Sequence, residues 1–295
     1  MAAARPAAYH RGLRLLLAPY LLGAVVLVAI PALLSFVLAF TQFDAVSPLR
    51  WIGLLNFKLL ALDPRLPIAL RNSLFYIALA VPLRVLGALL LALLLRERRP
   101  GVGVVRAAVY LPTVIPDVAY ALVWLWIFNP LYGPLNLLLG AAGLPTPAWL
   151  VQAETARPAL VFMSLFQIGE GFVLLLAGLS SLSRDYYASA AVDGASRWQM
   201  FWAITLPLLA PWLALLTVRD VILSFQTTFT PAYIMTGGDP YYATLFLPLL
   251  VFKEAFDNFR FGHGAALMTM LFLTTAILIG ALLLTYRGWM DADER

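Results

Sequence analysis

The few side chains of this sequence that could bind a polar molecule stand inside long apolar stretches. Glu170 lies between Gly169 and Gly171, and Gln167 precedes it by one turn on the same face of the predicted helix. Ionisable groups are rare and costly inside a membrane, where they mark substrate pathways or structural ion pairs. A carboxylate here could accept hydrogen bonds from solute hydroxyls, and the two glycines would let a ligand approach the backbone. A partner for a basic group on a neighbouring helix is an equally good interpretation.

A second polar group lies in a later apolar stretch. Arg219 and Asp220 are adjacent and point to different faces of the predicted helix, so each suits an ion pair with another helix. Glu170 is one candidate partner for Arg219, and we interpret the Arg219 and Asp220 side chains as structural. A dense polar run follows, which we interpret as a strip that contacts solute, although an ordinary helix-end cap would look similar. Its members are Ser224, Gln226, Thr227 and Thr228.

The sequence does not supply the residues of an enzyme. It has no cysteine, and neither His10 nor His263 has a second histidine or a carboxylate arranged around it for a metal. A nucleotide-binding P-loop needs the pattern G-x-x-x-x-G-K-[ST], and the two lysines, Lys58 and Lys253, each follow a phenylalanine instead. We therefore expect no catalytic residue, no metal site and no cofactor in this chain.

The composition predicts a membrane protein. Of 295 residues, 62% are hydrophobic and 12% are charged, whereas a soluble domain has about a quarter charged residues. About 20 apolar residues cross the hydrocarbon core of a bilayer. We predict an all-α polytopic membrane protein with a single membrane domain over 1–295 and a cytoplasmic helical loop over 182–203. The six predicted spans are roughly 15–40, 68–95, 103–128, 158–181, 204–225 and 264–286.

Arginine and lysine predict the orientation, because short cytoplasmic loops carry an excess of both. With the N-terminus inside, the cytoplasmic side collects eleven: Arg5, Arg11, Arg14, Arg96, Arg98, Arg99, Arg106, Arg184, Arg197, Arg287 and Arg295. The other side collects seven: Arg50, Lys58, Arg65, Arg71, Arg157, Lys253 and Arg260. We therefore place both termini and the loop 182–203 in the cytoplasm. Since these charges follow the spans and form no solvated patch, we expect no nucleic-acid partner.

The loop 182–203 has the features of a small folded knob. Ala188–Ala191 favours a short helix, and Gly194 suits a left-handed helix end. Ser196 could cap a second short helix over Arg197–Ala203. The aromatic side chains of that segment are Trp198, Phe201 and Trp202. A helix–turn–helix of small and aromatic residues suits docking into a groove of another protein, whereas the alternative is a loop whose aromatic rings rest in the lipid headgroups.

The segment Tyr186–Pro211 resembles the cytoplasmic coupling loop of the permease subunit of carbohydrate-type, binding-protein-dependent ABC importers. The family pattern reads roughly EAA-x-DGA, then an aromatic-rich stretch, a Leu-Pro pair and a further proline. The matching residues are Ala190, Ala191, Asp193, Gly194, Ala195, Trp198, Phe201, Leu206, Pro207 and Pro211. Ser189 stands where the family has glutamate. Further matches are Arg71–Tyr76, Ala255-Phe256, Arg260–Ala265 and the turn Met235–Pro240, in which Asp239 replaces the usual glycine.

The resemblance implies an assembly and a division of labour. It implies a heterodimer with a second permease subunit, two ATPase subunits that bind ATP and Mg, and an extracytoplasmic solute-binding protein, within the lipid of a bacterial inner membrane. Ser189 to Phe201 would dock on the ATPase, and the spans around Gln167 and Glu170 would line the solute cavity. The implied solute is a sugar, for which we favour a neutral di- or oligosaccharide over glycerol phosphate.

Two other functions are compatible with a polytopic chain. An ion-coupled secondary transporter is expected to show symmetrical halves with paired broken helices, which the sequence does not display. A membrane-embedded enzyme would have to use Glu170, Asp117 and Asp220 as catalytic carboxylates, without a nucleophile or a metal site. We rank the importer subunit first, the secondary transporter second and the enzyme third.

Overall fold

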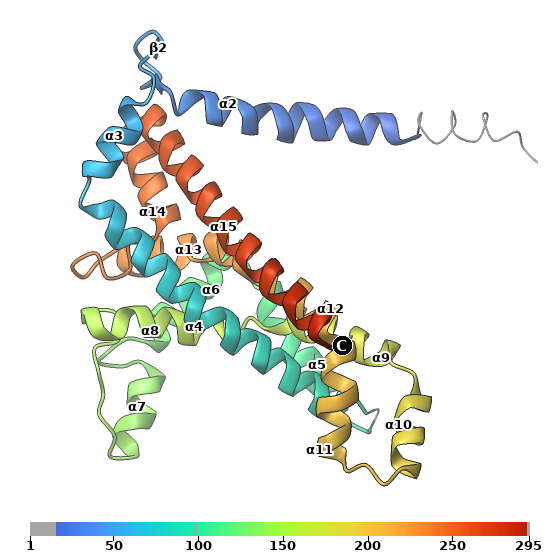
Figure 1. The fold of residues 1–295 in the computed structure, drawn as a ribbon. Helices are drawn as coiled ribbons and strands as arrows, with labels where there is room; N and C mark the ends of the chain where they lie inside the picture. The colour runs from blue at the N-terminus through green and yellow to red at the C-terminus, as the bar shows by residue number, and fades with distance from the viewer. Residues whose placement is uncertain (1–15, 98, 294–295) are drawn as a thin grey trace, which may run out of the picture. The chain divides into compact units, whose positions relative to one another are not determined.

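A computed structural model describes residues 16–97 and 99–293 of the chain (Figure 1). The arginines at positions 5, 11, 14, 98 and 295, which contributed to the predicted orientation, lie outside the described residues. The chain divides into two compact units. Unit 1 comprises residues 16–63 and 251–272, and unit 2 comprises residues 64–250 and 273–293.

Unit 1 combines helices with one short antiparallel ladder. Its elements are η1 (Val25–Ala29), α2 (Ile30–Leu38), β1 (Thr41–Gln42), β2 (Arg50–Trp51), α3 (Leu55–Leu62), η5 (Lys253–Asp257) and the first part of α15 (Phe261–Asp293). In the ladder Thr41 lies opposite Trp51. The amide of Asn56 donates to the backbone oxygens of Ala39 and Thr41, at 2.9 and 2.8 Å, and so joins α3 to the end of α2.

Unit 2 holds most of the helices and all of the predicted site residues. Its elements are α4 (Arg65–Leu94), α5 (Val102–Tyr110), η2 (Leu111–Val114), α6 (Asp117–Ile127), α7 (Pro134–Ala141), α8 (Ala153–Ser164), α9 (Gly169–Ser181), α10 (Arg184–Val192), α11 (Arg197–Met200), η3 (Phe201–Thr205), α12 (Leu206–Thr227), α13 (Phe229–Pro231) and η4 (Ala232–Thr236). The short helix α14 (Leu247–Phe252) ends just inside unit 1.

The predicted all-helical membrane fold is confirmed, and every predicted span coincides with helical structure. Among the described residues, four helices are long and apolar enough to cross a membrane, namely Leu16–Leu38, Arg65–Leu94, Arg197–Thr236 and Phe261–Tyr286. Two helix pairs pass the same test together but are bent, α5–η2 with α6 by 102° and α8 with α9 by 44°. The four continuous helices become six spans when each bent pair counts as one. The single domain over 1–295 stays a prediction.

The sharper bend follows from a proline. Pro116 disfavours helical backbone at the residue before it, and Ile115 is extended with ψ of 129°. Pro116 itself is extended at ψ 138°, and Asp117 opens α6. The predicted span 103–128 is therefore broken at Pro116.

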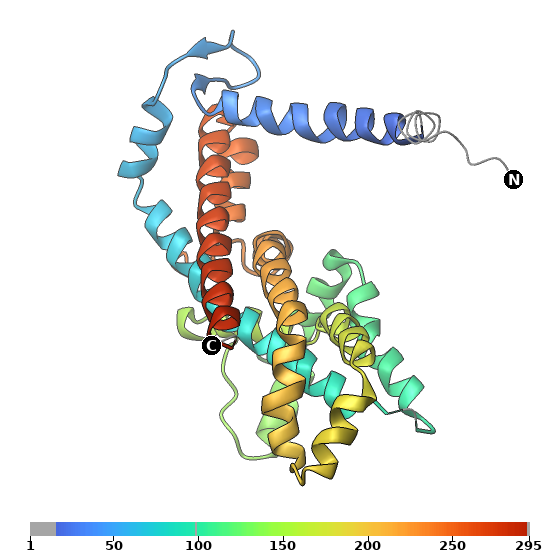
Figure 2. The ribbon, with the colours of Figure 1, turned by 45° about the vertical axis from the view of Figure 1, so that its right-hand side comes forward.

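The core of unit 2 is a bundle of α4, α9 and α12, which Figure 2 shows beside one another. Its buried members are Ala88, Leu89, Ala92, Phe172, Leu175, Leu179, Leu209 and Leu216. A Cβ on Gly169 would lie 2.8 Å from Tyr110 Cα, and one on Gly178 would lie 2.8 Å from Trp212 Cγ. A Cβ on Gly171 would lie 3.0 Å from Leu216 Cδ1. The expectation that Gly169 and Gly171 admit a ligand is therefore wrong, since neighbouring helices occupy that space.

Candidate functional site

The loop 182–203 folds around a helix end that needs glycine. At the C-terminal end of α10, the amide of Gly194 donates to Ala191 O at 3.2 Å, and the amide of Ala195 donates to Ala190 O at 2.9 Å. This pair of bonds is a Schellman motif, which requires a left-handed residue at the position of Gly194. Gly194 has φ of +80°. The predicted helix end at Asp193-Gly194 is thus confirmed, together with the backbone geometry that makes it.

The second helix of the loop begins at Ser196 and continues into the membrane segment. The Ser196 hydroxyl accepts from the Gln199 amide at 3.3 Å, and the Gln199 side chain accepts from the Ser196 amide at 2.8 Å. This capping box satisfies two otherwise unpaired amides at the helix start. The predicted cap at Ser196 is confirmed. The prediction that the second helix is short and ends at Ala203 is wrong. The helical stretch runs from Arg197 through η3 and α12 to Thr227, and after the turn residue Thr228 it continues in α13 and η4 to Thr236.

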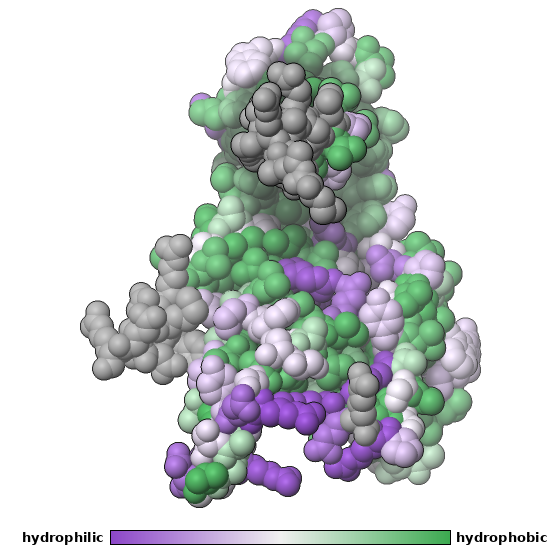
Figure 3. Space-filling view, turned by 90° about the vertical axis from the view of Figure 1, so that its right-hand side faces the viewer, coloured by the Kyte–Doolittle hydropathy of each residue, from purple (hydrophilic) through white to green (hydrophobic). Residues whose placement is uncertain are grey.

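The side chains of the loop face outward. Trp198 is 68% exposed and Trp202 is 51% exposed. Their rings contact each other and Phe201, at centroid distances of 5.3 to 6.0 Å. Ser189, Asp193 and Gly194 are exposed as well. Figure 3 shows hydrophilic side chains gathered at the end of unit 2 that carries this loop.

The loop is attached to the helix that follows it. The hydroxyl of Tyr187 on α10 lies 3.0 Å from the hydroxyl of Thr205 in η3. The Arg96 guanidinium lies over the face of the Tyr187 ring, 5.2 Å from the ring centroid. The loop is therefore connected by a side-chain contact, as well as by the chain, to the helix that carries the polar groups described next.

A buried ion pair joins α4 to α12. Arg84 Nε lies 2.9 Å from Asp220 Oδ2, and Arg84 Nη2 donates to Ser224 Oγ at 2.6 Å. The side chains of Arg84 and Asp220 are only 9% and 13% exposed. The sequence alone does not reveal this pair, because the two residues are 136 positions apart.

A second ion pair joins α9 to α12, between Glu170 and Arg219. It is the pairing that the sequence raised as one candidate. These side chains are far more accessible, at 50% and 35% exposed. Glu170 lies in the first turn of α9, where the helix dipole stabilises a negative charge. Gln167 lies in the non-helical segment 165–168, so its predicted place on the same helical face is wrong.

The polar run of α12 uses its hydroxyls within its own helix. Ser224, Thr227 and Thr228 each donate to the carbonyl four residues earlier, at 2.7, 3.0 and 2.8 Å. Ser224 and Thr228 are buried, Thr227 is half-buried and Gln226 is exposed. The assignment of these residues to the solute pathway stays a prediction.

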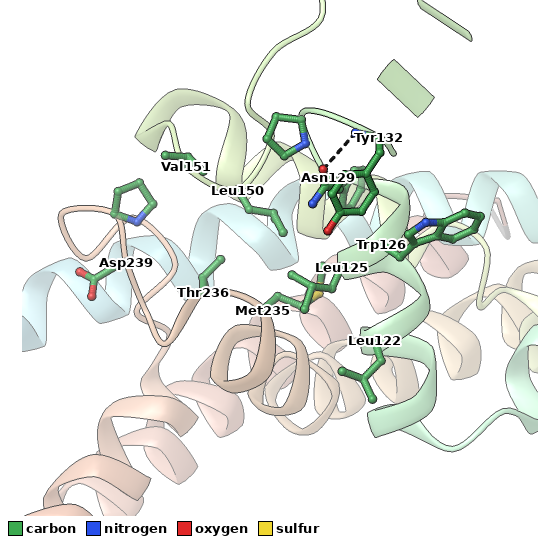
Figure 4. Close-up of a pocket in the computed structure, with 13 residues that line it drawn as sticks. Leu122, Leu125, Trp126, Asn129, Tyr132, Leu150, Val151, Met235, Thr236 and Asp239 are labelled. Carbon is green, nitrogen blue, oxygen red and sulfur yellow. Dashed lines mark hydrogen bonds between the residues drawn. The ribbon is translucent and has the colours of Figure 1, made fainter. Parts of the chain in front are cut away.

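A pocket of about 670 Å³ opens elsewhere in unit 2, beside the end of α6 (Figure 4). Trp126 and Tyr132 form one wall, and Met235 and Thr236 lie across from them. Asn129 accepts from the amide of Tyr132 at 3.1 Å. Most of the lining is apolar, with leucine, valine and proline side chains beside these rings. Among the residues that the structure describes, no group of three metal-ligating side chains occurs.

Comparison with known proteins adds a family to this geometry. Residues 84–290 match the family profile described as "Binding-protein-dependent transport system inner membrane component". The chain belongs to this family. It is therefore a permease subunit of an ABC importer, a multi-pass inner-membrane protein and not an enzyme, and the partner ATPase binds ATP.

Two relatives and one solved structure illustrate the likeness. The probable ABC transporter permease protein YesP of Bacillus subtilis is 33% identical over 95% of this chain and 91% of its own length. The trehalose/maltose transport system permease protein MalF of Thermococcus litoralis is 30% identical over 88% of both chains. A bacterial transporter for the acidic polysaccharide alginate shares the fold, with a TM-score of 0.81 at 24% identity over 93% of this chain and 94% of that one.

The burial of the Arg84–Asp220 pair gives a prediction about stability, with the exposed Arg99–Glu97 pair as its control. Arg84→Met removes the nearer, hydrogen-bonded partner of the buried Asp220 and leaves only Arg219, 3.9 Å away, which costs up to about 3–5 kcal/mol of unfolding free energy. Arg99→Met removes an exposed partner of Glu97, with side chains 73% and 70% exposed, and costs less than about 1 kcal/mol. An SDS titration of the purified chain measures both values. Equal losses in the two variants would contradict a structural role for Arg84.

Proposed function

We propose that this chain forms half of the translocation pathway for a neutral di- or oligosaccharide. A second, related permease forms the other half, two ATPase subunits drive the cycle, and an extracytoplasmic binding protein delivers the solute. The complex lies in a bacterial plasma membrane, with both termini of this chain and the loop 182–203 in the cytoplasm.

One observation carries the coupling part of this proposal. The outward-facing loop with its exposed aromatic rings is continuous with the helix that bears Arg219, Asp220 and Ser224. A helix is stiff, so a displacement imposed on the loop by a partner ATPase moves the polar groups in the membrane. Ser189 lacks the charge of the family glutamate, and the exposed carboxylate of Asp193 and the aromatic surface remain for docking.

The charge balance of the bundle supports a neutral solute. Arg84 is paired with Asp220, and Arg219 is paired with Glu170, so the four groups sum to zero. A phosphate would favour a pathway with unpaired arginines, because guanidinium groups bind phosphate strongly. The relative from Thermococcus litoralis is named for trehalose and maltose, which are neutral disaccharides. Alternating access requires that solute and ATP each prefer one of two states of the complex.

Replacing Gly194 tests the docking loop. Proline fixes φ near −65° and removes an amide donor, so Gly194→Pro breaks both the left-handed turn and the bond to Ala191 O. We expect the variant to insert and to assemble, and to lose solute-stimulated ATP hydrolysis and uptake. The measurement is uptake into proteoliposomes that contain the whole complex.

Gly143→Pro is the matched control for that variant. Gly143 has φ of +70°, its amide donates to Gly140 O at 3.0 Å, and no neighbouring atom lies within 4 Å of an added Cβ. The Gly143→Pro variant loses the same left-handed turn and amide donor, but at the end of α7 and not in the loop 182–203. Normal transport by Gly194→Pro, or equal loss in both variants, would contradict the docking role.

The absence of cysteine from the sequence allows a direct test of orientation. Val192 and Val46 are 89% and 91% exposed, so Val192→Cys and Val46→Cys should react equally well with a water-soluble maleimide. We expect Val192→Cys to react only in inside-out vesicles and Val46→Cys only in right-side-out vesicles. Labelling of Val192→Cys from the outside would refute the proposed topology.

A further inference from the structure

Two ion pairs attach α12 to its neighbours, and their surroundings differ. The Arg84–Asp220 pair is nearly closed to solvent, and Arg84 donates a further hydrogen bond to the Ser224 hydroxyl. Opening it would strand two charges in a bundle interior, which is strongly unfavourable. The Glu170–Arg219 pair is about one-third to one-half exposed. Water can replace each partner there, so this pair opens at little cost.

The backbone around Glu170 also favours contact with a solute. Glu170 follows the non-helical segment 165–168, and its helix α9 is bent by 44° from α8. Backbone without helical hydrogen bonds is tolerated at membrane depth where it is buried in protein or lines a watery cavity. An ionisable side chain within a span likewise faces the bundle interior or such a cavity. Glu170 is 50% exposed on this chain, so a solute can reach its carboxylate.

We propose that the Glu170–Arg219 ion pair determines solute specificity, and that a neutral polyhydroxy solute opens the pair as it passes. A carboxylate only accepts hydrogen bonds, and a guanidinium only donates them. Two neighbouring sugar hydroxyls can donate to Glu170 and accept from Arg219 at once, so every hydrogen bond lost from the pair is replaced. An anionic solute gains at Arg219 but is repelled by Glu170. This inference rests on the proposed function.

Arg84 acts in this scheme as a positioning residue. Through Asp220 and Ser224 it holds one face of α12 against α4. Arg219 reaches toward α9 and Glu170, and its guanidinium also lies 3.9 Å from Asp220 Oδ1. The buried Arg84–Asp220 pair thus fixes the rotation of α12, and the exposed Glu170–Arg219 pair presents the hydrogen-bonding groups to the solute.

Two substitutions separate the proposal from a structural role for the pair. We would place the complex of permeases and ATPases in nanodiscs without binding protein, and measure equilibrium binding of radiolabelled maltose and of radiolabelled digalacturonate. Glu170→Gln and Arg219→Gln should each weaken maltose binding by about 10-fold to 100-fold, as expected for lost hydrogen bonds to a charged group. Their effects on digalacturonate should have opposite signs. Glu170→Gln removes the carboxylate that repels the anion and raises the affinity for digalacturonate. Arg219→Gln removes the guanidinium that attracts the anion and lowers that affinity.

Glu97→Gln is the matched control, because Glu97 forms an exposed ion pair with Arg99 outside the bundle. It should bind both probes as the wild type does. Size-exclusion chromatography of each variant with its ATPase partner establishes assembly. Equal changes for both probes in Glu170→Gln, or changes of the same sign in both variants, would overturn the role of the pair and leave the proposed function standing. A wild-type complex that binds digalacturonate but not maltose would contradict the proposed solute class itself.

Discussion

The rest of this structure depends on the helical stretch that runs from Arg197 through η3 and α12. At 1.5 Å per residue, the 22 residues of α12 alone extend over about 33 Å, whereas the hydrocarbon core of a bilayer is about 30 Å thick. Such a helix crosses the membrane and also projects beyond it. Its first turn belongs to the exposed loop, and its middle carries the charged groups of the bundle. A displacement at one end is therefore also a displacement at the other.

The contacts along this helix divide its neighbours into two kinds. Toward α4, the Arg84–Asp220 pair is buried and strong. Toward α9, the contacts are the exposed Glu170–Arg219 pair and the close packing of glycines, with Trp212 against Gly178 and Leu216 against Gly171. Small residues let helices pack closely in membranes without interlocking side chains. The three helices share one buried core, so we expect them to stay packed and the exposed Glu170–Arg219 pair to be the contact that opens.

Much of this arrangement could be predicted from the sequence, for identifiable reasons. Long apolar runs define the spans, and Gly194 and Ser196 define the ends of the two loop helices because those geometries need those residue types. The continuity of the helix after Arg197 could not be predicted. Proline usually breaks or kinks a helix interior, but Pro207 lies within the first two residues of α12 and Pro211 is tolerated inside it. The bend at 165–168 contains no proline, so the sequence gives no signal for the position of Gln167.

Pairing between distant residues was the other limit. The charges of Arg84, Glu170, Arg219 and Asp220 are visible in the sequence as costly groups in apolar spans, and the need for partners follows from that cost. Which charge meets which depends on the rotation of each helix, and that rotation is set by packing. The buried core of α4, α9 and α12 fixes it. With this rotation Arg84 reaches Asp220 at 2.9 Å, and Arg219 pairs with Glu170 while it lies 3.9 Å from Asp220.

The stiffness of the Arg197–Thr236 helix can be measured with two spin labels. Arg197 and Gln226 are exposed positions on either side of η3, so Arg197→Cys with Gln226→Cys introduces the only two cysteines of the chain. Pulsed electron resonance on the assembled complex gives their distance without nucleotide and in the ATP-bound state. We predict the same distance distribution in both states, because the helix moves as one body. A shift of several ångströms would show that η3 absorbs the motion of the loop, and would contradict direct transmission to the polar groups of the bundle.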